Sequence, residues 1–275
     1  MHPIERLRYV ARASGADQAL LVQETAHALG AFRDDPAGLV AACRRVLDRH
    51  PGSGALWSLC ARVLTAAEPD AEAWAVIDEV AQDPTVAEVA HALPDEGTVC
   101  VVGWPEVAGD ALVRRGDLRV LAIDAHGEAA GLVRRLHQVD VDAEDVPASG
   151  VGAAVRMSDV VLVEAVAAGP DGLLAVAGSL AAAAVARQLD VPVWGVIGAG
   201  RALPAPMWDA VVGRQAAEPA EPWLLDEEVV PLALCTGLVQ PSGAVTSEVP
   251  PLTGVAPVAF ELVSGGSAPG TYRRA

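Results

Sequence analysis

Apolar side chains in the first third of the chain recur at the three- and four-residue spacing of amphipathic helices. Three such stripes cover residues 20–32, 39–47 and 56–64, and a fourth helix is predicted from Asp70 to about His91, with Pro84 as its expected break. Prolines and glycines separate the stripes, as is typical of helix connections. The pattern predicts a helical domain over residues 1–93.

The spacing changes after residues 94–97, where short β-branched runs begin to alternate with helical stretches. Strands are predicted at 98–103, 118–124, near 139–142, 159–165 and 191–197, and helices at 106–115, 128–137, 150–157 and 177–189. Such alternation is typical of a parallel sheet covered by helices. The chain is therefore predicted to have an α/β fold, in which a Rossmann-like parallel-sheet domain over residues 94–263 follows the helical domain.

The regular alternation stops beyond residue 200. Residues 214–223 are rich in Pro, Ala and Glu and read as an exposed loop, whereas 229–239 reads as one further strand. The last residues, 264–275, form a polar, Gly-rich tail that is predicted to be disordered.

The charge balance excludes one large class of partners. The 275 residues include 36 acidic and 19 basic side chains, which gives a net charge of −17. A protein that neutralises phosphate backbones needs clustered positive charge, so we expect no nucleic-acid partner. The sequence contains no Lys, which excludes a Schiff-base lysine and a P-loop lysine.

The cysteines and apolar runs indicate a cytoplasmic protein with no membrane partner. The four cysteines form no C-x-x-C pair, and Cys43, Cys60 and Cys100 lie in apolar patterns where a buried thiol is usual. The N-terminus is charged from residue 5 and lacks the apolar core of a signal peptide. The longest nearly apolar run, residues 172–186, is too short to span a bilayer.

Several familiar motifs of enzymes are absent from the sequence. It contains no G-x-G-x-x-G fingerprint, no G-x-S-x-G elbow and no H-E-x-x-H motif, and its six histidines show no metal-like spacing. We therefore expect no cofactor and no metal.

Ligands of open parallel sheets bind beyond the carboxyl ends of the strands. The loops at those ends are 103–104, 124–127, 164–172 and 198–201. Asp124, Glu164 and Asp171 lie in them and are the candidate catalytic carboxylates. Their glycines would let a backbone approach a ligand, although glycine is equally the default residue of a turn.

Two helix starts are candidate phosphate sites, because a helix N-terminus offers free N–H groups to an anion. Gly52 and Ser53 precede the third apolar stripe, where Ser53 is also a good N-cap in its own right. Gly172 opens a turn that leads to Gly178 and Ser179 at the start of the Ala-rich helix, where close packing of a Gly/Ala helix is the alternative reading.

The order of four segments resembles one known family, that of the initiation factor 2B regulatory subunits and the aldose–ketose sugar-phosphate isomerases. Its members include methylthioribose-1-phosphate and ribose-1,5-bisphosphate isomerases. The segments similar to the family's signatures are HPGSGALWSL (50–59), VLAIDAHGEAAGLVRRL (120–136), MSDVVLVEAVAAGPDGLLAVAGSLAAAAVARQLDVPVWGV (157–196) and VVPLALCTGLVQPSGAVTSEVPPLTGVAPVAFEL (229–262). The resemblance implies a helical domain before a Rossmann-like domain, with dimers formed through the latter.

The functional positions of that family differ in this chain. Gly103 stands where the isomerases have a catalytic Cys, and Val166 where they have a proton-carrying Asp. His126 and His50 replace two arginines, and Asp124 stands in place of a Glu. Gly and Val cannot transfer protons, whereas isomerisation needs a positioned acid and base.

The resemblance therefore implies a divergent member that binds a sugar phosphate or nucleotide without the isomerase chemistry, His126 contributing to the phosphate site when protonated. One alternative is an active aldose–ketose isomerase of a phosphorylated pentose with replaced catalytic groups. Another is a regulatory subunit that acts through protein contacts. A homodimer through residues 94–263 is expected in each case.

Overall fold

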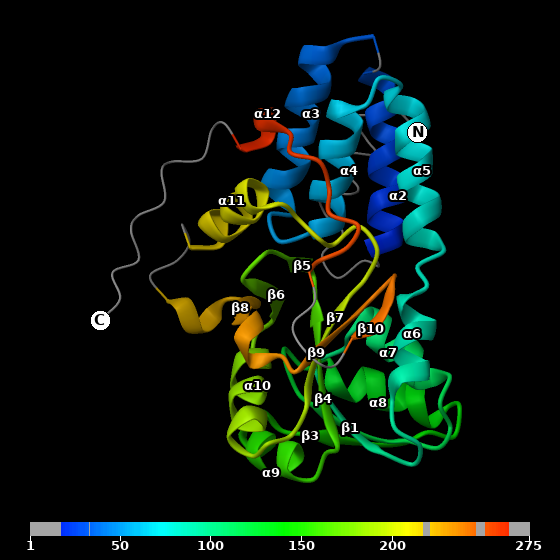
Figure 1. The fold of residues 1–275 in the computed structure, drawn as a ribbon, viewed down its shortest axis with the longest axis vertical. Coiled ribbons are helices and arrows are strands. Elements are labelled where there is room, and N and C mark those ends of the chain that lie inside the picture. The colour runs from blue at the N-terminus through cyan, green and yellow to red at the C-terminus, as the bar shows by residue number, and fades with distance from the viewer. Residues whose placement is uncertain (1–17, 33, 217–220, 246–250, 264–275) are drawn as a thin grey trace.

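The computed structural model describes residues 18–32, 34–216, 221–245 and 251–263. It has the predicted α/β class, with helices above and a mostly parallel sheet below in the view of Figure 1. The tail predicted to be disordered, 264–275, lies outside the described residues.

The upper part consists of four helices that follow the predicted apolar stripes: α2 (Gln18–Leu29), α3 (Pro36–Arg49), α4 (Gly54–Thr65) and α5 (Pro69–Ala81). Asp35 caps α3 by accepting the Gly38 N–H at 2.9 Å, and Pro36 occupies the first turn, where no donor is needed. Helix α4 is buried along most of its length and carries Trp57, which is fully enclosed. The predicted fourth helix does break at Pro84, and its second half is α6 (Thr85–Ala92).

The main sheet has seven strands in the order β10-β9-β7-β4-β1-β2-β3. Their bounds are β1 (Thr98–Val102), β2 (Arg119–Ile123), β3 (Asp142–Val146), β4 (Val160–Ala165), β7 (Val193–Ile197), β9 (Gly237–Gln240) and β10 (Gly243–Val245). Neighbouring strands are parallel except for β10, which pairs antiparallel with β9. Because the central strands are covered on both faces, they read in sequence as continuous apolar runs.

Two hydrophobic clusters cover the two faces of this sheet. On one face pack α6, α7 (Glu106–Val113) and α8 (Ala129–His137), and on the other α9 (Val151–Arg156) and α10 (Ser179–Gln188). A small antiparallel sheet, β5-β6-β8, adjoins the second cluster. Its strands are β5 (Ala167–Ala168), β6 (Gly172–Val176) and β8 (Glu227–Pro231).

Three predictions about local structure were wrong. Residues 229–239 are not one strand, because Pro231 lacks a donor and a 3-10 turn at Leu232–Leu234 sends β8 and β9 into different sheets. Residues 172–176 form strand β6 and not a turn. Helix α11 (Ala205–Ala216) occupies part of the region expected to be irregular, including the first residues of the loop predicted at 214–223.

The helical part and the sheet part share a core. One hydrophobic cluster contains buried side chains of all four helices, α2, α3, α4 and α5. It also contains Leu174, Leu203 and Met207, which lie beyond residue 94. The Gly54 N–H at the start of α4 donates to the Val166 carbonyl at 2.9 Å, at the end of β4. A side chain at Gly54 would meet the carbonyl oxygens of Val166 and Arg201, each at 2.9 Å. The contact between the two parts is therefore close-packed at this point.

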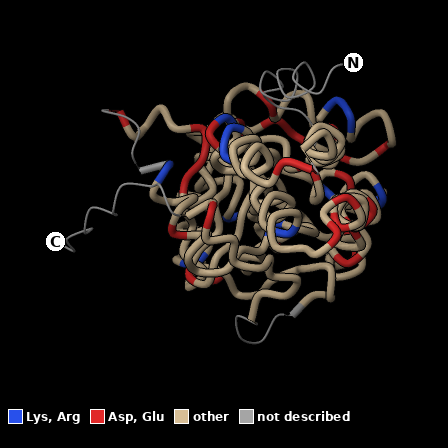
Figure 2. The backbone as a smooth tube through the Cα atoms, turned by 90° about the horizontal axis from the view of Figure 1, so that it is seen from above, with Lys and Arg blue, Asp and Glu red and all other residues tan. Residues whose placement is uncertain are grey.

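The four cysteines are buried free thiols, as predicted for Cys43, Cys60 and Cys100. In the view of Figure 2, the arginine positions of the described residues are scattered among acidic ones and form no single basic face. Among the described residues, no helix combines the length and the apolar character that crossing a bilayer requires.

Candidate functional site

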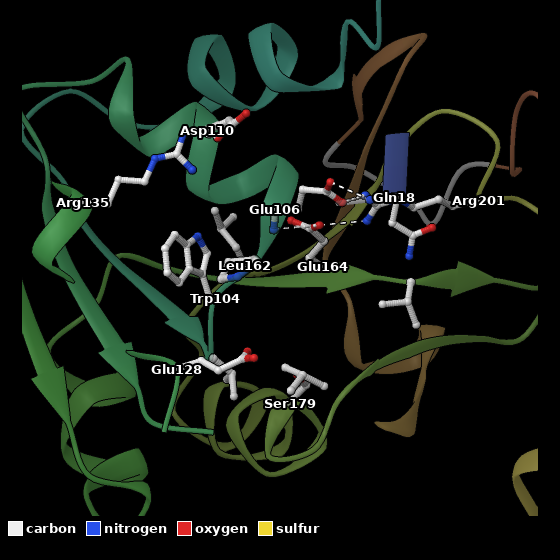
Figure 3. A pocket seen from close by; sticks show the side chains of 14 residues that line it. Gln18, Trp104, Glu106, Asp110, Glu128, Arg135, Leu162, Glu164, Ser179 and Arg201 are labelled. Atoms are coloured by element: carbon white, nitrogen blue, oxygen red, sulfur yellow. Dashed lines mark hydrogen bonds and ion pairs between the residues drawn. The ribbon is translucent and has the colours of Figure 1, made fainter. Parts of the chain in front are cut away.

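A cavity of about 560 Å³ opens where the carboxyl ends of β1 and β4 meet the helical part. Its wall combines polar and apolar side chains, and Figure 3 shows the side chains that line it. They are Gln18, Val102, Trp104, Pro105, Glu106, Asp110, Glu128, Arg135, Leu162, Glu164, Val166, Val176, Ser179 and Arg201. This is the edge at which ligands of parallel α/β sheets bind.

Glu164 is the most heavily bonded side chain of the cavity. It lies near the end of β4, and its carboxylate accepts three backbone N–H groups from the first turn of α7, at 3.1, 3.1 and 2.8 Å. A helix N-terminus attracts a negative charge through its free N–H groups and its dipole. The protein's own carboxylate thus occupies the anion-binding position that this helix start provides.

Arg201 balances that carboxylate from the loop after β7. Its guanidinium is 2.8 Å from both Glu164 and Glu106, and it also donates to the Ala165 carbonyl at 2.9 Å. Burial favours the neutral form of Arg201, but the charges of Glu164 and Glu106 outweigh burial and hold its pKa above the ordinary value. Arg201 is therefore a charged structural anchor with its donors directed at the wall.

The same network reaches the helical part through Gln18 on α2. The Gln18 N–H donates to Glu106 at 3.0 Å, and the Ser53 hydroxyl donates to the Gln18 side-chain oxygen at 3.0 Å. Ser53 also caps α4 by accepting the Leu56 N–H at 3.4 Å. Helix ends from both parts of the chain are therefore tied to one polar wall.

Trp104 forms the opposite wall of the cavity and follows the turn at Gly103, whose φ is +65°. A Cβ at Gly131 would lie 2.6 Å from the indole Cζ3 atom, so the ring rests directly on the backbone of α8. Gly109 of α7 lies against the other end of the ring. The missing side chain at Gly131 gives the indole its place against α8, and the Trp104 residue stays 41% exposed.

Four further polar side chains line the cavity beside Trp104. Arg135 pairs with Asp110 at 2.7 Å across the gap between α8 and α7. Glu128 and the nearly buried Ser179 make no side-chain hydrogen bond or ion pair with the described part of the chain. Their oxygens are the polar groups that a ligand in this cavity would find available.

The predicted site residues are only partly gathered here. Glu164 and Ser179 line the cavity. Gly178 lies at the start of α10, but its N–H and that of Leu180 donate to Glu228 at 2.6 and 2.9 Å. The Glu228 side chain therefore holds this helix N-terminus. A phosphate at Gly178 and Ser179 would have to displace Glu228.

Three other predicted residues, Asp124, His126 and Asp171, are not part of the cavity wall. Asp124 accepts the Ala129 N–H at 3.3 Å, and His126 is exposed with its Nδ1 atom 3.7 Å from an Asp226 oxygen. Asp171 accepts the Trp208 indole N–H at 2.7 Å.

Of two predicted glycines, Gly172 belongs to the small sheet and Gly52 lies beside it. Gly172 pairs with Pro231 in that sheet. Gly52 lies against Glu227, because a Cβ at Gly52 would meet the Glu227 carboxylate at 2.1 Å. The catalytic and phosphate-binding roles predicted for these residues, and for Asp124, His126, Asp171 and Ser53, stay predictions.

The sequence pointed to Trp104 and Arg201 only as members of strand-end loops, and it gave no sign of Glu106, Glu128 or Arg135. These three lie on or beside helices, where a charged residue normally faces solvent. Only the packing of α7 and α8 brings them to one cavity. Among the described residues, no group of three His, Cys, Asp or Glu side chains is placed to hold a metal ion.

Comparison with solved structures identifies the fold. The chain superposes on the translation initiation factor eIF-2B of Pyrococcus horikoshii OT3 with a TM-score of 0.71 and 13% identity, covering 89% of this chain and 96% of that one. It matches a chain of the tetrameric eIF2B-beta2-delta2 complex of C. thermophilum with a TM-score of 0.71 and 16% identity, over 89% and 90% of the two chains. The eIF2B beta subunit of Chaetomium thermophilum gives 0.67 and 17%, over 89% and 86%.

No family model matches the sequence, and no curated protein is significantly similar to it. The chain therefore has the fold of the initiation factor 2B subunits, as the order of its segments predicts, with little residue identity to them.

Proposed function

We propose that this protein binds a small, hydroxyl-bearing molecule in the cavity between Trp104 and the Glu164–Arg201 wall, and that it does not catalyse sugar isomerisation. The observation that carries the proposal is the state of Glu164, whose oxygens are engaged by three backbone N–H groups and by Arg201. Four donors already engage this carboxylate, three of them at Oε1, so taking up a substrate proton would compete with the bonds that hold the wall. The carboxylate acts as an internal anion that shapes the wall.

The positions that resemble the isomerases' catalytic residues support the same proposal. Val166 lines the cavity, so the place that resembles their proton-carrying Asp is occupied by an apolar side chain. Gly103 offers no nucleophile at the end of β1. What remains is a partly apolar cavity with a few oriented polar groups, which is the usual composition of a ligand pocket.

The proposed ligand could also carry a phosphate, as a sugar phosphate or a nucleotide does. Arg135 is the cation that would meet the phosphate, because Arg201 is surrounded by its own partners. The start of α7 is held by Glu164 and that of α10 by Glu228, so neither helix start needs an anion from the ligand. We therefore place the sugar or nucleoside ring, and not the phosphate, at the centre of recognition.

The test is a thermal-shift series with ribose, ribose 5-phosphate, adenosine and adenosine monophosphate, on the intact protein and on Trp104→Ala. Trp223→Ala is the matched control, because Trp223 is 76% exposed and is not part of the cavity wall. We expect at least one compound to raise the melting temperature of the protein and of the control but not that of Trp104→Ala. No shift with any compound at millimolar concentration, or an equal shift in all three proteins, would overturn the proposal.

A second candidate function is that of a subunit acting through protein contacts. It is favoured by the likeness to a chain of a tetrameric complex and by an apolar groove of about 480 Å³ on the outside of the sheet part. The groove lies between α9 and α10 and is lined mainly by Ala153, Met157, Val185 and Leu189, with Met157 56% exposed. A second copy of this chain is the occupant we assign to it, as part of a homodimer through residues 94–263.

A further inference from the structure

The cavity has an excess of negative charge, which bears on the kind of ligand that it accepts. Four carboxylates line it, those of Glu106, Asp110, Glu128 and Glu164, against the two guanidinium groups of Arg135 and Arg201. Arg201 is shared by Glu106 and Glu164, and Arg135 pairs with Asp110. A recess lined by one sign of charge attracts the opposite sign and repels its own.

Glu128 is the carboxylate of this set without an ion-pair partner among the described residues. It precedes α8, and Figure 3 shows its carboxylate directed into the cavity from the same side as Ser179. A carboxylate that borders a partly apolar space forms its strongest hydrogen bonds with a ligand that brings a positive charge or N–H donors.

Trp104 adds a second feature that favours a cation. The backbone at Gly131 supports the indole from behind, and the exposed part of the ring borders the cavity. The face of an indole attracts positive charge, and an ammonium group that also meets a carboxylate there is held by both.

Ser179 supplies an independent sign that a ligand belongs here. The residue is 2% exposed and lines the cavity, yet its hydroxyl has no hydrogen-bond partner in the part of the chain that the structure describes. The hydroxyl oxygen is not among the fully enclosed polar atoms without a partner, so it reaches the cavity and can take a hydrogen bond from a ligand there. A ligand hydroxyl would satisfy it, and the amide N–H₂ of Gln18 and the outer N–H groups of Arg135 could accompany it.

We propose that the ligand is a small hydroxyl-bearing ring that carries a protonated amine, with the ring against Trp104, the ammonium group at Glu128 and a hydroxyl at Ser179. This inference rests on the proposed binding function and deepens it by naming the charge of the ligand. It also makes a dianionic phosphate the least favourable substituent at this position.

The experiment compares three rings that differ mainly in charge: glucosamine, glucose and glucose 6-phosphate. Their affinities are measured by isothermal titration calorimetry on the intact protein, on Glu128→Gln and on Glu261→Gln. Glu261 is an exposed carboxylate of α12 (Phe260–Val263) outside the cavity wall, so its variant removes one charge without altering the site.

We expect glucosamine to bind about tenfold more tightly than glucose, because one charge-assisted hydrogen bond contributes on that order. Glu128→Gln should bring the ratio of the glucosamine and glucose affinities close to one, whereas Glu261→Gln should keep the tenfold ratio.

Tightest binding by glucose 6-phosphate, a glucosamine preference that survives in Glu128→Gln, or no binding of glucosamine at millimolar concentration would each overturn the inference. The pentose and nucleoside series separates this failure from that of the proposed function. A shift there that depends on Trp104 would keep the binding site and reject only the amine.

Discussion

Arg201 and Glu164 form an ion pair at 2.8 Å in which the two side chains are only 5% and 8% exposed. The pair joins the loop after β7 to the end of β4 and, through Glu106, to the start of α7. Charges buried to this extent persist only when each is compensated, so the pair fixes the wall of the cavity.

Removing Arg201 should therefore destabilise the protein strongly. We expect Arg201→Met to lower the free energy of unfolding by about 3–5 kcal/mol, because it leaves the Glu164 carboxylate buried without a counter-charge. Urea denaturation followed by circular dichroism measures the change. Arg119→Ala is the comparison, since Arg119 pairs with Glu144 at 2.6 Å near the surface, where solvent screens the charges, and its loss should be much smaller. Equal losses in the two variants would show that burial does not decide the contribution of these pairs.

Gly54 should tolerate no side chain at the junction of the two parts. A Cβ there would meet the carbonyl oxygens of Val166 and Arg201, each at 2.9 Å, and backbone cannot move aside as a flexible side chain can. We expect Gly54→Ala to lower the free energy of unfolding by about 1–3 kcal/mol. Gly213→Ala is the control, because nothing lies within 4 Å of the added atom in α11 and alanine favours a helix by up to about 1 kcal/mol. A neutral Gly54→Ala would contradict the close packing described at this point.

Glu227 should make the stability of the fold depend on pH. Burial, reinforced by the neighbouring Asp226 charge, raises the pKa of Glu227 to about 7 from 4.5. Between these values the folded protein holds a proton that the unfolded chain releases, so the free energy of unfolding falls as the pH rises. The contribution of protonated Glu227 to the free energy of unfolding is fully present below pH 4.5 and is lost as the pH passes through about 7.

Glu227→Gln should remove this dependence because its side chain cannot ionise. We expect the stability of the variant relative to the parent protein to increase from pH 5 to about pH 7 and to level off above it, as measured by urea unfolding at each pH. Glu261→Gln should show no such trend. A difference between Glu227→Gln and the parent protein that does not change with pH would mean that the raised pKa is not realised in solution.

The groove between α9 and α10 predicts the state of assembly. We expect light scattering after size-exclusion chromatography to give the mass of two 28.2 kDa chains for the parent protein. Met157→Glu places a charge in the apolar groove and should shift the protein to the mass of one chain, whereas Trp223→Ala should leave it a dimer. A monomeric parent protein, or a dimer that Met157→Glu leaves intact, would contradict the interface assigned here.

Much of the architecture could be predicted because its signals are local. The β-branched runs at 98–102 and 160–165 and the helical stripes of α3 and α4 lie where the spacing of apolar residues indicates. Strand β3 gave a weak signal because its sequence, DAEDV, buries only one side chain at the sheet edge. Strand β6 was missed because GLLAV is apolar throughout. It shows neither the two-residue alternation of a strand nor the 3.6-residue period of a helix.

The site was less predictable, and for a physical reason. Glu164 could be named because a strand end places it at the ligand-binding edge. Its partners could not, because Arg201 and the first turn of α7 lie far from it along the chain. Trp104 becomes a wall of the cavity only because Gly131, on the next helix, leaves room for the ring. Such contacts depend on tertiary packing, which one sequence does not encode in any short pattern.

Proton NMR of ribose 5-phosphate and ribose with the intact protein tests binding without isomerisation most directly, because one sample reports both. Saturation transfer from protein to sugar detects binding, and the appearance of ketose signals detects isomerisation. We expect saturation transfer to at least one of the two sugars that is lost in Trp104→Ala and kept in Trp223→Ala, with no ketose formed over hours. Accumulation of ketose, or saturation transfer that Trp104→Ala leaves unchanged, would contradict the proposal that the cavity binds a sugar without isomerising it.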